Sequence, residues 1–215
     1  MAKRVRHQKV RPPAQDALES DWRLFVAIPM PEAARNLMGR VIQLLAHEDW
    51  PVRWIDPDTA HMTLHFLGAT PPEQAELLRM VLATPAAKIP TFELKTSGLG
   101  VFPNARRPRV IWIGLDGETD QLQRLYREIG GTLSALGLAP DTDRFNPHIT
   151  LGRVRDTASP AFAAAIQTQL DANSATSRIT ANSVKVPVDE ILLVRSFLDA
   201  KGAKHTPIAS FPLAK

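Results

Sequence analysis

Two short stretches of the chain carry the side chains best suited to chemistry, and their sequences are nearly the same. Residues 61–64 read His-Met-Thr-Leu, and residues 148–151 read His-Ile-Thr-Leu. A neutral imidazole accepts a proton and a protonated one donates it, and both forms are accessible near neutral pH. A threonine hydroxyl can donate a hydrogen bond to a phosphate oxygen. Two such pairs facing one site would cleave a phosphodiester without a metal or a covalent intermediate.

The elements that position these groups are predicted to be strands, because both stretches are rich in residues that favour the pleated sheet. Alternate side chains of a strand point to opposite faces. In each copy the histidine and the threonine therefore share a polar face. In the first copy Met62, Leu64 and Phe66 form the opposite, apolar face.

A metal site is the alternative interpretation of the first stretch, because His61 and His65 have the spacing of two ligands on a helix. On a strand their side chains lie roughly 13 Å apart, at about 3.3 Å per residue, which is too far for one ion. The chain has no cysteine to complete a thiolate site. We therefore expect no metal and no cofactor, and we place His65 at the rim of the site.

The segments around both motifs resemble the 2H phosphoesterase superfamily, in particular its bacterial and archaeal RNA 2′,3′-cyclic phosphodiesterases, also called 2′-5′ RNA ligases. The resemblance rests on RLFVAIP at 23–29, VRWIDPDTAHMTLHFLG at 52–68, GLGVFPNARRPRVIWIG at 98–114 and FNPHITLGR at 145–153. It implies an α+β fold of two pseudo-symmetric lobes with antiparallel sheets around a central cleft. Each lobe would carry one motif strand.

The resemblance also implies an activity, the hydrolysis of 2′,3′-cyclic phosphate ends of RNA or nucleotides to 2′-phosphates. By that resemblance His61 is the general acid and His148 the general base, while Thr63 and Thr150 bind the phosphate. One alternative is the reverse reaction, 2′-5′ joining of RNA ends. Another is a non-catalytic module that binds RNA ends, although binding alone does not require two proton carriers.

Arg153 lies where close relatives in this family carry a phosphate-binding arginine. Strict alternation places it on the face opposite His148. A bulge at Gly152 would return it to the polar face, because glycine inside a strand often marks a bulge. We expect Arg153 to bind phosphate; the alternative is a rim arginine paired with Asp156.

Two aromatic residues are candidate nucleotide contacts. Trp54 lies in a predicted strand at 52–55, where the alternative is a place in the core. Phe102 lies in a predicted loop at 98–108 that also contains arginines, and such a loop can hold a nucleotide by stacking and phosphate contact. The alternative is an ordinary solvated hairpin loop.

One departure from the family pattern lies near the C-terminus. Relatives usually have a glutamate before the serine of the penultimate strand and a tyrosine in the last strand. This chain has Arg195 before Ser196, and His205 in the last strand. The departure leaves the substrate preference open.

Several predicted strands follow one another without a helix between them, which favours an antiparallel α+β fold over a doubly wound parallel sheet. Strands are predicted at 22–28, 52–55, 91–97, 109–115, 177–186, 190–199 and 204–212. Helices are predicted at 31–46, from 71 onward, at 119–136 and at 160–170.

Composition allows one large domain or two closely packed lobes, because 215 residues with 44% hydrophobic content can bury a full core. Since the resemblance implies a site shared by two lobes, we expect a single catalytic domain at 21–215. Residues 1–20 hold five Lys or Arg against two acids, which predicts a disordered basic arm, either a solvated tail or an RNA-binding segment. The absence of cysteine and of a long apolar run predicts a cytoplasmic protein without a membrane segment. We expect a monomer whose partner is RNA or a cyclic nucleotide, with no obligate protein partner.

Overall fold

Two antiparallel sheets form the framework of the computed structural model. The structure describes residues 21–46, 50–138, 145–156, 158–171, 179, 182–199 and 202–215. The predicted basic arm at 1–20 lies outside the described residues. Within the described ranges the prediction of an α+β fold with antiparallel sheets is confirmed.

The first sheet has four strands, in the order β3 (His61–Thr70), β1 (Trp22–Pro29), β8 (Glu190–Asp199) and β9 (Gly202–Pro212). The second has five, in the order β2 (Val52–Trp54), β6 (His148–Val154), β5 (Val110–Gly117), β4 (Phe92–Phe102) and β7 (Lys185–Val188). The first motif therefore opens β3 of one sheet, and the second opens β6 of the other.

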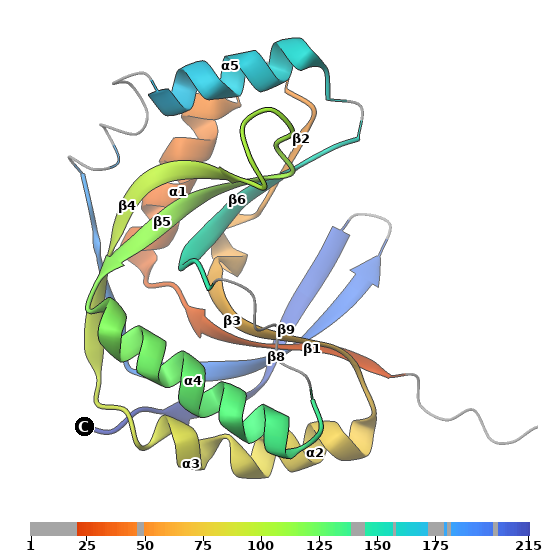
Figure 1. Cartoon of the computed structure of the whole chain (residues 1–215), viewed down its shortest axis with the longest axis vertical. Helices are drawn as coiled ribbons and strands as arrows, with labels where there is room; N and C mark the ends of the chain where they lie inside the picture. The colour runs from red at the N-terminus through yellow and green to blue at the C-terminus, as the bar shows by residue number, and fades with distance from the viewer. Residues whose placement is uncertain are drawn as a thin grey trace, which may run out of the picture.

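The helices flank the two sheets on their outer sides (Figure 1). α2 (Pro72–Val81), α3 (Ala83–Ala86) and α4 (Thr119–Ala135) lie together beside the four-stranded sheet, while α1 (Glu32–Leu45) and α5 (Pro160–Asp171) lie beside the other. A short 3-10 helix, η1 (Pro57–Thr59), leads into β3. None of the helices in the described ranges is long and apolar enough to cross a bilayer.

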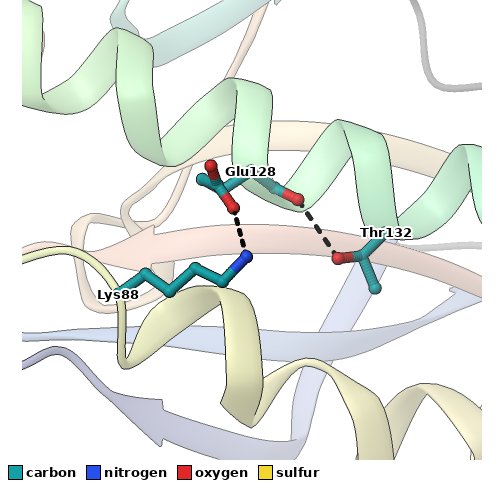
Figure 2. Close-up of polar contacts among 3 residues, drawn as sticks. All are labelled: Lys88, Glu128 and Thr132. Atoms are coloured by element: carbon teal, nitrogen blue, oxygen red, sulfur yellow. Dashed lines mark hydrogen bonds and ion pairs between the residues drawn. The ribbon is translucent and has the colours of Figure 1, made fainter.

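The α4 helix shows how sequence periodicity places a helix. Its buried stripe, which the spacing predicts, consists of Leu122, Leu125, Ile129 and Leu133. On the side of α4 that faces α3, Glu128 accepts a hydrogen bond of 2.9 Å from Lys88, and the Thr132 hydroxyl donates to the Glu128 carbonyl at 3.1 Å (Figure 2). Both charged side chains are exposed, so this ion pair contributes little and the apolar stripe holds the helix.

The strand β4 runs further than the sequence predicts, because it continues to Phe102 through the expected loop. A register shift between Thr96 and Leu99 lets the strand stay paired with β5. Gly100 is needed there, since a Cβ at this position would lie 2.1 Å from the Trp112 ring. Only the part of the predicted loop after Phe102 connects the two strands.

The main hydrophobic core draws on both sheets. It contains Val26 and Ile28 of β1 together with Ile111 and Ile113 of β5, all at most 1% exposed. A shared core makes the two sheets one packed body and fixes the faces from which the motif residues project.

Candidate active site

The two motif histidines are anchored in the same way. His61 Nδ1 bonds the carbonyl oxygen of Thr59 at 2.8 Å, and His148 Nδ1 bonds that of Asn146 at 2.7 Å. A carbonyl can only accept, so we assign the hydrogen of each neutral ring to Nδ1. Nε2 of each ring is then left to exchange a proton with a substrate. The strands that begin at these histidines, β3 and β6, contact each other.

A bulge falls at the leucine of the first motif. Thr63 and His65 are both paired with β1, while Leu64 between them has no partner on that strand. An extra residue of this kind reverses the alternation of faces beyond it. His65 is therefore buried, only 2% exposed, and its ring stacks on Tyr126 of α4 at 4.1 Å between centroids.

The bulge corrects two predictions. His65 does not lie at the rim or on the face of His61, because it points into the core side of the sheet and its Nε2 bonds the Tyr126 carbonyl at 2.9 Å. Phe66, predicted on the apolar face, is 57% exposed and lies 6.2 Å from the Phe25 ring that stacks on His61. The apolar face ends at the bulge.

The second motif carries a bulge at the equivalent leucine. Thr150 and Gly152 are paired with β5, and Leu151 between them is not. The predicted bulge is therefore present, one residue before the glycine. It turns Arg153 to the face of His148.

Arg153 does not make the ion pair that the alternative interpretation requires. Asp156 contacts Arg109 instead. In the described part of the chain no ion pair joins Arg153 to a carboxylate. Its positive charge lowers the pKa of both His61 and His148, as expected of a guanidinium close to both rings.

The His61 ring lies among other rings. Phe25 of β1 stacks on it at 4.9 Å, and His205 of β9 meets it edge-on at 5.3 Å. His205 also lies 5.1 Å from Phe25. The histidine that departs from the family pattern is therefore a direct neighbour of the first motif histidine.

Burial lowers the pKa of His61 to about 4 from the usual 6.5. The hydrogen bond to Thr59 acts in the opposite direction, and the positive charges of His205, Arg153 and His148 lower the pKa further. In the absence of substrate His61 is neutral at pH 7.

The His148 ring is more open to solvent. Phe102 meets it edge-on at 4.9 Å, and Trp112 lies 6.2 Å away. Burial lowers its pKa, the hydrogen bond to Asn146 raises it, and the charge of Arg153 lowers it. The predicted contact residue Phe102 is thus beside a motif histidine.

A column of three stacked rings links the two motifs. His65, four residues after His61, stacks on Tyr126, and Tyr126 stacks on Phe145 at 4.2 Å. Phe145 directly precedes Asn146, whose carbonyl anchors His148. The strand of the first motif and the segment that anchors His148 are therefore both packed against one residue of α4.

Trp54 is not brought to the site. Its side chain packs against the main core and covers Gly152, where an added Cβ would lie 2.9 Å from the indole. The residues that the sequence interpretation missed are Phe25 and Trp112, and it named His205 only as a departure. Phe25 and Trp112 lie in strands made up mostly of apolar residues, so no pattern singled them out.

One hollow of the described chain lies away from the motif histidines. It is an open groove of about 380 Å³ between α1 and η1, lined by Arg35, Asn36, Gly39, Arg40, Gln43, Asp56, Pro57 and Asp58. None of the predicted site residues lines it. In the described residues no three His, Cys, Asp or Glu side chains are grouped to hold a metal, and the absence of a cofactor stays a prediction.

Two sheets that each present an Nδ1-anchored histidine followed by threonine make this an α+β protein with a duplicated histidine site. Residues 32–196 match the 2′-5′ RNA ligase superfamily, and the chain belongs to that family.

Relatives named RNA 2′,3′-cyclic phosphodiesterase match much of the chain. That of Thermotoga maritima is 32% identical over 62% of this chain and 70% of its own length. That of Methanothermobacter thermautotrophicus is 28% identical over 89% and 98%.

Solved structures agree on the fold. A protein of Thermus thermophilus has a TM-score of 0.67 at 25% identity, over 88% of this chain and 97% of that one. LigT of E. coli complexed with 3′-AMP has a TM-score of 0.64 at 23% identity, over 91% and 99%.

Proposed function

We propose that the protein hydrolyses 2′,3′-cyclic phosphate ends of RNA or nucleotides and leaves a 2′-phosphate. The observation that carries the proposal is the pair of histidines with the same Nδ1 anchor on two strands that touch. Two rings that both present Nε2 can take one proton and give another on opposite sides of a phosphorus atom. The names of the relatives in other organisms support the same substrate.

In the proposed reaction His148 Nε2 takes a proton from water as the water oxygen bonds to phosphorus. The bond from phosphorus to the 3′ oxygen breaks, and His61 Nε2 gives its proton to that oxygen. The bond to the 2′ oxygen stays, so the product is a 2′-phosphate. These two roles follow the family resemblance, which also implies that the substrate binds in a cleft between the two lobes.

The phosphoryl oxygens gain charge during this step. Thr63 and Thr150 lie on the faces of their histidines and are partly exposed, so both hydroxyls can donate to these oxygens. Arg153 supplies a positive charge, and charge-assisted hydrogen bonds are the strong ones. No cofactor or metal is part of the proposal.

The low pKa of His61 sets a condition on its role as the acid. A ring that is neutral at pH 7 has to gain a proton when the substrate binds. The negative charge of the bound phosphate favours the imidazolium and so raises the pKa in the complex. The same electrostatics allow His61 to be the base, which makes the two roles an experimental question.

The test is to incubate the purified protein with an oligonucleotide that ends in a 2′,3′-cyclic phosphate and to locate the phosphate of the product. A 2′-phosphate, formed equally with and without EDTA, supports the proposal. Joining of a 5′-hydroxyl RNA to this end identifies the reverse reaction. Tight binding without turnover identifies the binding module, and the double variant His61→Ala/His148→Ala is the control for contaminating nucleases.

A further inference from the structure

A second arginine lies directly beside Arg153. Arg53 of β2 is its partner across the antiparallel pair of β2 and β6. The flanking residues of β2, Val52 and Trp54, face the core. Arg53 therefore projects from the opposite face, the one that Arg153 shares with His148.

This pair stands at the edge of the five-stranded sheet, since β2 is its outermost strand. Directly opposed residues have Cβ atoms about 4.5–5.5 Å apart, and like charges in that position are destabilising. Among the described residues no carboxylate is ion-paired with either guanidinium. The charge of Arg53 also lowers the pKa of Arg153, after the larger effect of burial.

The opposite edge of the same sheet shows the ordinary arrangement. Lys95 of β4 and Lys185 of β7 are also directly opposed. There Glu93 contacts Lys185 at 2.9 Å and neutralises it. Likewise, the groove that holds Arg35 and Arg40 includes its own aspartates. The pair of Arg53 and Arg153 lacks such an anion within the described chain.

We propose that Arg53 binds a second phosphate, the 5′-phosphate of the nucleotide whose 2′,3′-cyclic phosphate is held by Arg153. This proposal rests on the proposed function. In an RNA chain the nearest anion to the reacting phosphate is the diester on the 5′ side of the same nucleotide. Arg53 and Arg153 are directly opposed on neighbouring strands, so each guanidinium group can bind one of two phosphates of the same nucleotide. Arginine forms bidentate hydrogen bonds to phosphate. The substrate class is therefore an RNA 3′ end, and a cyclic nucleoside phosphate without a 5′-phosphate satisfies only half of the site.

The experiment compares adenosine 2′,3′-cyclic phosphate with the same compound carrying a 5′-phosphate. We expect the wild-type protein to prefer the 5′-phosphorylated compound about tenfold or more in kcat/KM, the size of one charge-assisted contact. In Arg53→Gln the ratio of the two kcat/KM values should fall to about one. Arg53→Lys keeps the positive charge but cannot form a bidentate hydrogen bond, so its ratio of the two kcat/KM values should be intermediate.

The matched control is Lys95→Gln, which changes an opposed cation at the other edge of the sheet. It should leave the ratio at its wild-type value. A salt series adds a readout independent of folding, because loss of one phosphate contact to a single strand reduces the slope of log affinity against log salt by about 0.7.

The outcomes separate this inference from the proposed function. A wild-type ratio near one, or a ratio that Arg53→Gln leaves unchanged, overturns the second phosphate site while the hydrolase stands. Absence of turnover of both compounds overturns the hydrolase. In that case the ratio of the binding affinities for the two compounds replaces the ratio of kcat/KM values. Equal affinities for the two compounds overturn the second phosphate site.

Discussion

His61 on β3 and His148 on β6 are held by the same backbone device and surrounded by different side chains. Each ring is fixed through Nδ1 by the carbonyl two residues earlier, and each strand has a bulge at the motif leucine. Around His61 the structure places Phe25 and His205, and around His148 it places Phe102 and Trp112. The duplicated sequence repeats the orientation of the ring, while the environment differs between the copies.

The positions after the two bulges differ most. The first strand continues with His65 and Phe66, the second with Gly152 and Arg153. The bulge thus exposes the aromatic ring of Phe66 in the first copy and the cation of Arg153 in the second. Burial lowers the pKa of both rings, and the charge of Arg153 lowers both further.

The largest expected effect separates the two histidines by chemistry. Replacing either His61 or His148 by alanine should lower kcat on a cyclic phosphate about 10²- to 10⁴-fold, the usual range for a general acid or base. A nitrophenyl phosphodiester needs no acid, because its leaving group is stable as an anion. On that substrate His61→Ala should recover most of the loss and His148→Ala should not.

Rescue of His148→Ala instead of His61→Ala would reverse the two roles and keep the mechanism. If neither alanine variant lost activity on the cyclic phosphate, the site itself would be wrong. Circular dichroism of both variants controls for the fold.

The second prediction concerns stability against pH. The pKa of folded His61 is about 4, below the usual 6.5, so between these values the unfolded chain binds more protons. The free energy of unfolding therefore falls as the pH drops from 6.5 to 4, by up to about 3 kcal/mol from this residue. Urea titrations measure this fall in the free energy of unfolding, which should be smaller by that amount in His61→Gln than in wild type. The difference between His148→Gln and wild type should be smaller. Parallel curves for His61→Gln and wild type would contradict the burial of a neutral ring.

The third prediction uses the positions after the bulges. Arg153→Gln should lower kcat/KM about 10- to 100-fold, because it removes a charge-assisted contact to the phosphate. Phe66→Leu, the equivalent position in the first copy, should change kcat/KM by less than the arginine substitution. Steady-state kinetics on one cyclic phosphate measure both. Equal losses would mean that the two copies contribute symmetrically to phosphate binding.

The smallest expected effect comes from the stacked rings. Tyr126→Leu should lower kcat several-fold, since an aromatic pair is worth about 0.5–1.5 kcal/mol beyond its buried area. Tyr126→Phe should keep more of the activity than Tyr126→Leu, because it retains a ring to stack on and His65 bonds the backbone of residue 126. A Leu variant that is less stable with an unchanged kcat would show that the stack only supports the fold.

The sequence predicted most of the elements and the motif residues because their signals are periodic. The strand predicted at 177–186 is an exception, because the strand described there, β7, covers Lys185–Val188. Alternation identified the strands at 61 and 148, and helical spacing identified α4. The bulge at Leu64 could not be predicted, since one extra residue leaves the composition of a strand unchanged. At the second motif Gly152 gave a signal, and there the bulge was expected.

The two aromatic residues beside the motif histidines were not predicted from the sequence, for a related reason. Phe25 and Trp112 lie in central strands with apolar residues on both faces, and such strands read as continuous apolar runs without a preferred side. Trp54 was a candidate contact with a place in the core as the alternative, and it packs against the core. The pairing of β2 with β6 shows that its neighbour Arg53 has the orientation expected of a contact residue.

The column of His65, Tyr126 and Phe145 has a consequence for how such proteins are recognised. Catalytic groups have to be aligned within fractions of an ångström, and an error of about 1 Å can cost 10²-fold in rate. In this chain three stacked rings outside both His-x-Thr-Leu tetrapeptides join the strand of the first histidine to the segment that anchors the second. A homologue that keeps both tetrapeptides and loses these rings would retain every motif side chain without this connection between them. A search for the two His-x-Thr-Leu motifs alone would not distinguish such a homologue from this protein.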